Sequence, residues 1–219
     1  MVDIFDEVEE DLRAERAQRL ARKYGWVAIL GAGLVVAGVA GWQFYGRWQA
    51  QQNAAVAARY IAAMDAAQQA PAVNAEARAA QVAPLDALAG NAPQGYQILA
   101  RLTAAGLKAN AGDIQGAVTE YNQVAADPKA DPLLRDLASL LAVQRQLDQG
   151  DPQQLSSRLE ALAVPGNPWA PLAREQLAIL DLRQGKTEDA RTKLKALASD
   201  ILAPAGVRAR ANALLAGIG

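Results

Sequence analysis

The chain has 219 residues and a formal net charge of −1, and 52% of the residues are hydrophobic while only 5% are aromatic. Because the charges balance, no overall field attracts nucleic acid, and no basic run interleaved with aromatic residues offers bases a stacking surface. The sequence contains neither cysteine nor histidine. This excludes disulfides and thiol chemistry, and an enzyme would have to rely on carboxylates, lysine or hydroxyl groups. Alanine supplies much of the apolar fraction and favours closely packed helices, so we expect an all-α protein without a cofactor or metal.

Residues 1–25 form a charged arm with the sequence MVDIFDEVEEDLRAERAQRLARKYG. Its apolar residues have helical spacing and predict one apolar face, made of Ile4, Phe5, Val8 and Leu12. Two interpretations remain open. The face contacts a cytoplasmic partner or the bilayer surface, or the arm is a solvated helix that only fixes topology.

Residues 26–45, WVAILGAGLVVAGVAGWQFY, contain no charged residue. At 1.5 Å rise per residue, a helix of this length spans about 30 Å, the thickness of the hydrocarbon layer. Aromatic residues stand at both ends, where amphipathic rings prefer the headgroup interface. We therefore predict a transmembrane helix. The alternatives are a buried core helix or a signal peptide cleaved near Ala55-Val56-Ala57, but the length of the run and the arm before it favour an anchor.

Positive charge is unequal on the two sides of this segment. Arg47 and Arg59 follow it closely, whereas five basic residues precede it: Arg13, Arg16, Arg19, Arg22 and Lys23. Basic residues stay on the cytoplasmic side, so we expect a cytoplasmic N-terminus. In a Gram-negative cell this predicts a single-pass inner-membrane protein with residues 46–219 in the periplasm.

Small residues recur at every fourth position inside the segment, at Gly33, Ala37 and Gly41. Such spacing lines one face of a helix and lets a partner backbone approach closely, which predicts a docking seam. Because Gly and Ala are abundant throughout the chain, chance spacing is the alternative.

In residues 46–219, turns that contain Gly or Pro separate helical segments at regular intervals, as in helical repeats. A helix over 47–70 ends before Pro71, and another over 74–89 ends before a turn at 90–93. Three further turns each separate two apolar-periodic segments, 38 and 35 residues apart: Gly112-Asp113, Gly150-Asp151 and Gly185-Lys186. A period of this length with two helices per unit predicts an α-solenoid of degenerate tetratricopeptide-like helix pairs.

Other helix boundaries carry Asp or Asn before Pro, a combination that caps free amides and starts a helix. They are Asp127-Pro128, Asp131-Pro132, Asp151-Pro152 and Asn167-Pro168. We interpret these side chains as caps and not as catalysts.

The small residues that let two helices cross closely differ between the units. The third unit has Ala178, Gly185 and Ala190 at these positions. In the first unit, Gly112, Ala117 and Tyr121 fit the same repeat pattern. The middle unit keeps only Gly150, with Leu155 where alanine is usual, so the register of this unit stays open.

The combination of arm, anchor and degenerate repeats resembles the ancillary SecYEG translocon subunit family, the YfgM-like proteins. The resemblance is strongest over MVDIFDEVEEDLRAERAQRLARKYGWVAIL, GWQFYGRWQ and LAILDLRQGKTEDARTKLKAL. It implies association with the Sec protein-export channel. It also implies a membrane-anchored periplasmic chaperone that hands newly exported proteins to other periplasmic chaperones.

If the repeat geometry of that family holds, the first helix of each pair faces a concave surface. This candidate surface comprises Leu99, Leu102, Asn110, Leu140, Gln144, Asp148, Leu172, Glu175, Ile179 and Arg183. Its aliphatic character suits extended or partly unfolded chains better than a charged peptide terminus. The alternative is that several of these leucines belong to the core between repeats.

The leading hypothesis is therefore a non-enzymatic interaction protein with protein partners: Sec translocon subunits, periplasmic chaperones or exported clients. An envelope scaffold for cell-wall or division machinery would have the same topology. An enzyme would need carboxylates such as Glu175, Asp181, Glu188 and Asp189. The last two fall in the first turn of a helix, where acids meet the helix dipole favourably, so we expect no catalytic residue.

Overall fold

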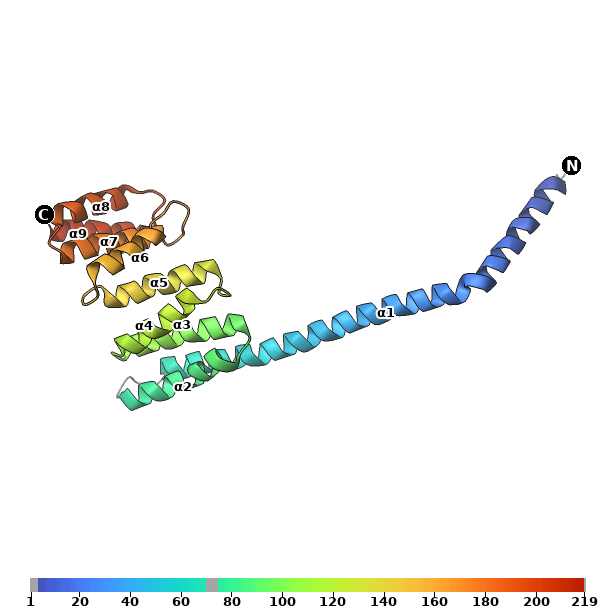
Figure 1. The fold of residues 1–219 in the computed structure, drawn as a ribbon, viewed down its shortest axis with the longest axis horizontal. Coiled ribbons are helices and arrows are strands. Elements are labelled where there is room, and N and C mark those ends of the chain that lie inside the picture. The colour runs from blue at the N-terminus through green and yellow to red at the C-terminus, as the bar shows by residue number, and fades with distance from the viewer. Residues whose placement is uncertain (1–3, 70–74, 219) are drawn as a thin grey trace. The chain divides into compact units, whose positions relative to one another are not determined.

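The structure of the protein is a computed structural model that describes residues 4–69 and 75–218. Every regular element in these ranges is an α-helix, which confirms the expected all-α class. The helices are drawn in Figure 1 and run in the order α1 (Ile4–Gln69), α2 (Ala75–Asn91), α3 (Gln94–Asn110), α4 (Ile114–Ala126), α5 (Pro132–Gln146), α6 (Pro152–Leu162), α7 (Ala170–Arg183), α8 (Thr187–Ser199) and α9 (Ala205–Gly217).

The chain divides into two compact units, Met1–Ala55 and Val56–Gly219. In the described part of the first unit, α1 alone is present, and it exposes large apolar side chains such as Trp26, Leu34 and Trp42. By length and composition α1 could cross a membrane over Ile29–Ala67, with a mean hydropathy of 1.4. A signal sequence near an N-terminus would satisfy the same test.

The arm is helical from Ile4 onward. The side chains of Ile4, Phe5, Val8 and Leu12 lie outside the described residues. The apolar face expected there stays a prediction.

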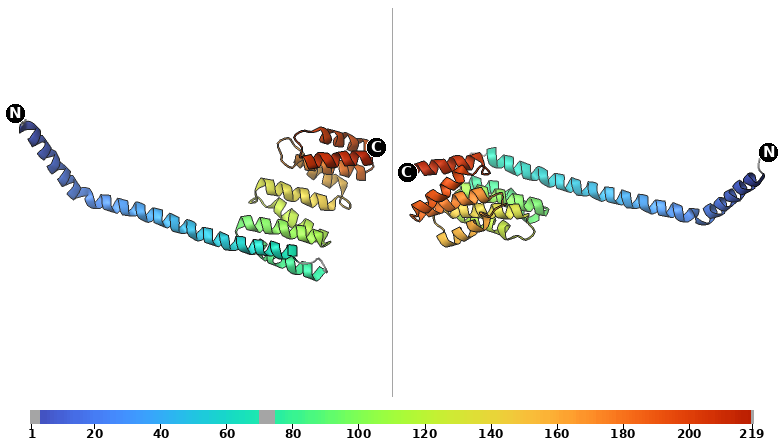
Figure 2. Two further views of the ribbon diagram at one scale, coloured as in Figure 1. Left: turned by 180° about the vertical axis from the view of Figure 1, so that it is seen from behind. Right: turned by 90° about the horizontal axis from the view of Figure 1, so that it is seen from above.

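In the second unit, each helix from α2 to α9 packs on its neighbour in the chain, and α9 also contacts α7. Figures 1 and 2 show these consecutive helices lying side by side. The last turns of α1 join the stack through Ala63, which is buried with Val82 and Leu85 of α2. Tyr60 of α1 also reaches α3, where its hydroxyl lies 2.8 Å from that of Thr103. The second unit is thus a helical stack that begins inside α1.

The three expected helix pairs are present as α3–α4, α5–α6 and α7–α8. Gly112 and Gly185 end the first helix of their pairs with φ of +89° and +74°, which residues with a side chain rarely adopt. Gly150 has no positive φ, and the reason for glycine there is space. A Cβ would lie 2.9 Å from the backbone oxygen of Gln146 and 3.0 Å from Cδ1 of Leu155. The middle pair therefore accommodates a leucine where the other pairs have alanine.

At two of the four Asp/Asn-Pro boundaries, the Asp side chain caps the helix that follows, as predicted. Asp131 accepts a hydrogen bond of 2.8 Å from the amide of Leu133, and Asp151 accepts one of 3.2 Å from Gln153. Asp127 instead follows the end of α4 and holds the turn before α5, and Asn167 holds a turn three residues before α7 begins. These boundaries are structural, as expected, although the last two are turns.

The core is built largely from alanine at the helix crossings. Ala117, Ala178 and Ala190 have no exposed surface, as the small-residue pattern predicts. Leucines fill the wider spaces, notably Leu159, Leu180 and Leu194. The predicted helix over 74–89 is observed as Ala75–Asn91. It continues through Gly90, so the turn before α3 is shorter than predicted.

Candidate interaction surface

The candidate surface on the first helices of the pairs is only partly accessible. Five of its residues are exposed: Leu99, Asn110, Gln144, Asp148 and Arg183. Three are half-buried: Leu102, Leu172 and Ile179. Leu140 and Glu175 are buried, with 4% and 2% of their surface exposed.

The two buried residues do not belong to an accessible surface, and the reason is local packing. Leu140 packs in the core shared by α5, α6 and α7, together with Val143 and Leu159. The Glu175 carboxylate accepts two hydrogen bonds of 2.6 Å from the guanidinium of Arg210 on α9. A helical face that is regular in sequence is thus interrupted where other helices of the stack cover it.

The α7 part of the surface is mainly structural. Leu172 packs against the core that α7 shares with α5 and α6 and against the core that it shares with α8 and α9, and Ile179 packs against the first of these. Arg183 donates hydrogen bonds to the backbone oxygens of Leu147, at 2.5 Å, and Gly150, at 2.7 Å. It therefore satisfies carbonyl groups at the C-terminal end of α5 and connects two repeats.

The remaining accessible residues lie on α3 and at the C-terminal end of α5. On α3, Leu99 is 39% exposed, and Asn110 follows three turns later on the same helix face. On α5 and just beyond it, Gln144 and Asp148 are both exposed. This smaller set mixes one aliphatic side chain with amide and carboxylate groups, so it is more polar than the sequence predicted.

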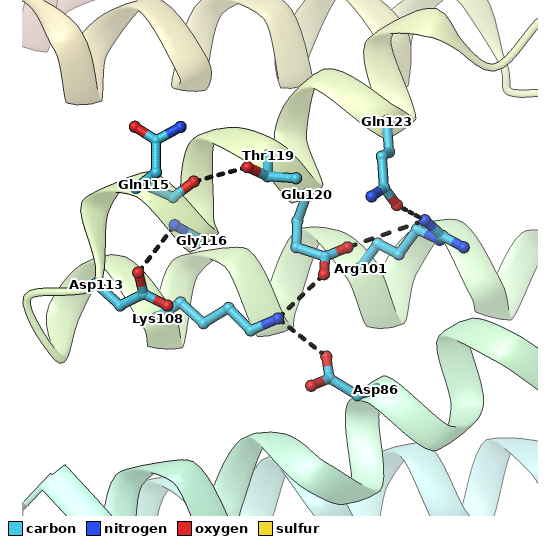
Figure 3. A network of polar contacts seen from close by, with 9 residues as sticks. All are labelled: Asp86, Arg101, Lys108, Asp113, Gln115, Gly116, Thr119, Glu120 and Gln123. Atoms are coloured by element: carbon cyan, nitrogen blue, oxygen red, sulfur yellow. Dashed lines mark hydrogen bonds and ion pairs between the residues drawn. The ribbon is translucent and has the colours of Figure 1, made fainter.

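A polar network connects α2, α3 and α4 beside this region (Figure 3). Lys108 of α3 lies 3.3 Å from the Asp86 carboxylate and 3.0 Å from that of Glu120. Arg101 contacts Glu120 at 3.9 Å and donates a hydrogen bond to Gln123. Burial alone would lower the pKa of Lys108, but the hydrogen bonds and charges of Glu120 and Asp86 outweigh it and raise the pKa. Because the charges are paired, we interpret the network as a link between three helices.

One half-buried cation has only neutral partners. Arg158 of α6 donates hydrogen bonds to Asn122, at 2.9 Å, and Ser139, at 3.3 Å. Burial lowers the pKa of this guanidinium. Because an arginine stays charged even so, we interpret Arg158 as a polar link between α4, α5 and α6.

The carboxylates considered for an enzyme do not converge. Glu175 pairs with Arg210, and Asp181 pairs with Lys193. Glu188 and Asp189 are exposed in the first turn of α8, as expected. Over the described ranges, no group of three or more carboxylates could hold a metal ion.

An apolar pocket that the sequence analysis missed lies between the end of α1 and α2. It has a volume of about 570 Å³, and its lining includes Val56, Arg59 and Ala63 from α1 and Pro84 and Leu88 from α2. Most of the other lining residues are alanines, whose short side chains leave the space open. Helical spacing of apolar residues predicts which face of a helix is buried. It does not predict whether the side chains of two adjacent helices fill the space between them, so the pocket was missed.

Among the residues that the structure describes, none packs against the predicted seam on α1. Gly33, Ala37 and Gly41 are all exposed. A methyl group added at Gly33 or Gly41 would meet no described atom within 4 Å apart from the adjacent residues and the backbone of its own helix. Close approach of a second helix at this face remains a prediction.

The tetratricopeptide repeat-like domain family has a sequence model that matches residues 19–192 of this chain. The match covers well over half of the chain, including the uncharged run and the helices from α2 to the first part of α8. No curated protein and no solved structure matches the chain.

Proposed function

This chain belongs to the tetratricopeptide repeat-like domain family, and we propose that it is a membrane-anchored interaction protein at the Sec export channel. Repeat arrays of this kind present extended surfaces for protein partners, and they are not usually enzymes. In the proposed role, α1 holds the array at the inner membrane, and the array binds exported clients or periplasmic chaperones. The observation that carries the proposal is this combination of a repeat domain with a long apolar helix.

The anchor is supported by the uncharged run at 26–45 and by the excess of basic residues before it. We propose that residues 1–25 lie in the cytoplasm and that residues 46–219 lie in the periplasm. The seam of Gly33, Ala37 and Gly41 would then be available to a helix of the channel inside the bilayer.

The proposed client-binding surface consists of the exposed residues of the candidate surface on α3 and at the end of α5: Leu99 and Asn110 on α3, Gln144 on α5 and Asp148 just beyond it. A surface that mixes aliphatic and amide groups can bind an extended chain through side-chain contacts and hydrogen bonds. The resemblance to ancillary SecYEG subunits supports exported clients and periplasmic chaperones as the partners of this surface.

Photo-crosslinking in living cells tests this surface. A photoreactive amino acid replaces Leu99 or Gln144 in the full chain, with Thr119, which is exposed on α4, as the matched control. We expect crosslinks from the first two positions to periplasmic chaperones or newly exported proteins, and few from the control. Equal crosslinking from all three positions would contradict the proposed surface.

A further inference from the structure

The connection between α8 and α9 exposes two large aliphatic side chains. Ile201 is 84% exposed and Leu202 is 87% exposed. They have the highest exposure of the large apolar residues described in the second unit. Adjacent exposed aliphatic residues are costly in water and indicate a surface that meets an apolar environment.

This exposure does not result from a loose connection, because the turn is held on both sides. Asp200 accepts a hydrogen bond of 2.9 Å from the amide of Leu202, and its backbone oxygen accepts one of 3.1 Å from Ala203. Arg174 of α7 pairs with the Asp200 carboxylate at 3.5 Å. Ala203, which follows, is buried. The turn therefore presents Ile201 and Leu202 from a fixed backbone.

Charge is distributed unevenly along the array, and this turn lies in its basic part. Residues 183–219 contain seven Lys or Arg against three Asp or Glu, whereas residues 111–182 contain five against ten. Of the three acids, Asp200 is paired with Arg174, and the other two lie at the opposite end of α8. Lys193 and Arg210 are paired with Asp181 and Glu175 of α7, and the positive charge that remains in this part of the array favours an anionic partner.

Two cations flank the aliphatic pair in the sequence. Lys195 lies near the end of α8, and Arg208 lies in the first turn of α9. In the part of the chain that the structure describes, neither forms an ion pair with an acid. An apolar turn with basic residues before and after it in the sequence is the pattern of segments that insert shallowly into a bilayer and pair with lipid phosphates.

We propose that the α8–α9 turn is a lipid-contacting element. Ile201 and Leu202 enter the boundary between headgroups and acyl chains, and Lys195 and Arg208 bind the phosphates of anionic lipids. The inference rests on the proposed anchor only in that α1 keeps the array beside a bilayer. It does not depend on the identity of the protein partners.

Depth-dependent fluorescence quenching tests the contact. Because the chain has no cysteine, Leu202→Cys allows a single fluorophore to be attached to the full-length protein. The protein is reconstituted in vesicles of equal parts phosphatidylglycerol and phosphatidylcholine, with brominated acyl chains as quenchers. Val164→Cys with the same label is the matched control, because Val164 is also an exposed aliphatic residue in a connection between helices. Ile201→Cys gives a second position in the same turn.

We expect quenching of labels at positions 201 and 202, and little at position 164. Neutralising the cations with Lys195→Gln and Arg208→Gln should weaken the contact about fivefold for each residue, as should the use of phosphatidylcholine alone. Equal quenching at the turn and the control would overturn the proposal. So would a label at position 202 that is shielded from water but not quenched by lipid, which would indicate a protein contact instead.

Flotation of the same vesicles separates this inference from the anchor. Protein that floats with the lipid but shows no quenching at the turn would contradict the lipid contact alone. Protein that neither floats with the lipid nor shows quenching would contradict both the membrane anchor and the lipid contact of the turn. Quenching together with failure to recover channel subunits from cells would support the lipid contact and contradict the Sec association.

Discussion

At the scale of single residues, the middle helix pair depends on a steric relation between Gly150 and Leu155. A Cβ on Gly150 would press on the backbone oxygen of Gln146, which cannot move freely, and on the side chain of Leu155. We expect Gly150→Ala to lower the free energy of unfolding by about 1–3 kcal/mol. Urea denaturation of the full chain in detergent, followed by circular dichroism, measures this change.

Leu155→Ala in the same protein is the control for this mechanism. This substitution removes the clash between a Cβ at position 150 and the Leu155 side chain. The double variant should therefore lose less free energy of unfolding than the two single variants lose together. Additive effects would mean that Gly150 and Leu155 are not coupled. The sequence indicated that this pair departs from the pattern, but not that the glycine compensates for the leucine. That relation depends on the distance between two helices, which a repeat pattern does not contain.

At the scale of elements, the polar network on α2, α3 and α4 makes the stability of the array depend on pH. The pKa of Lys108 is raised above its usual 10.5 in the folded state, so its contribution is fully present below pH 10.5. This contribution is lost as the pH rises through the raised pKa. We expect the free energy of unfolding to fall over this alkaline range.

Lys108→Met is the matched variant, because it keeps most of the side-chain length without the charge. Burial also raises the pKa of Tyr121, which removes stability in a similar pH range through a different group. The difference between the wild type and Lys108→Met isolates the lysine. A pH-independent difference above pH 10 would contradict the proposed role of Lys108.

The elements also illustrate what a sequence pattern can predict. Three turns with glycine identified the helix pairs correctly, because a left-handed residue or a close approach requires glycine. The candidate surface was less accurate, because Leu140 and Glu175 have the same helical spacing as exposed residues but are covered by other helices. The pocket beside α1 and the exposed turn at Ile201 were missed, since burial depends on packing between helices.

At the scale of the whole molecule, the proposed topology places the arm and the array on opposite sides of a membrane. The chain has no cysteine, so Ala14→Cys and Gln144→Cys each introduce a single reactive thiol. In intact cells with a permeable outer membrane, we expect a membrane-impermeant maleimide to label the second variant and not the first. Detergent should make both react, which controls for buried thiols. Labelling of the first variant in intact cells would contradict the cytoplasmic N-terminus.

The central claim is association with the Sec export channel through a membrane-anchored repeat domain. Affinity purification of the full chain from detergent-solubilised native membranes, with identification of the co-purifying proteins, tests it most directly. We predict enrichment of the channel subunits together with periplasmic chaperones. Enrichment of cell-wall or division proteins without channel subunits would contradict the claim.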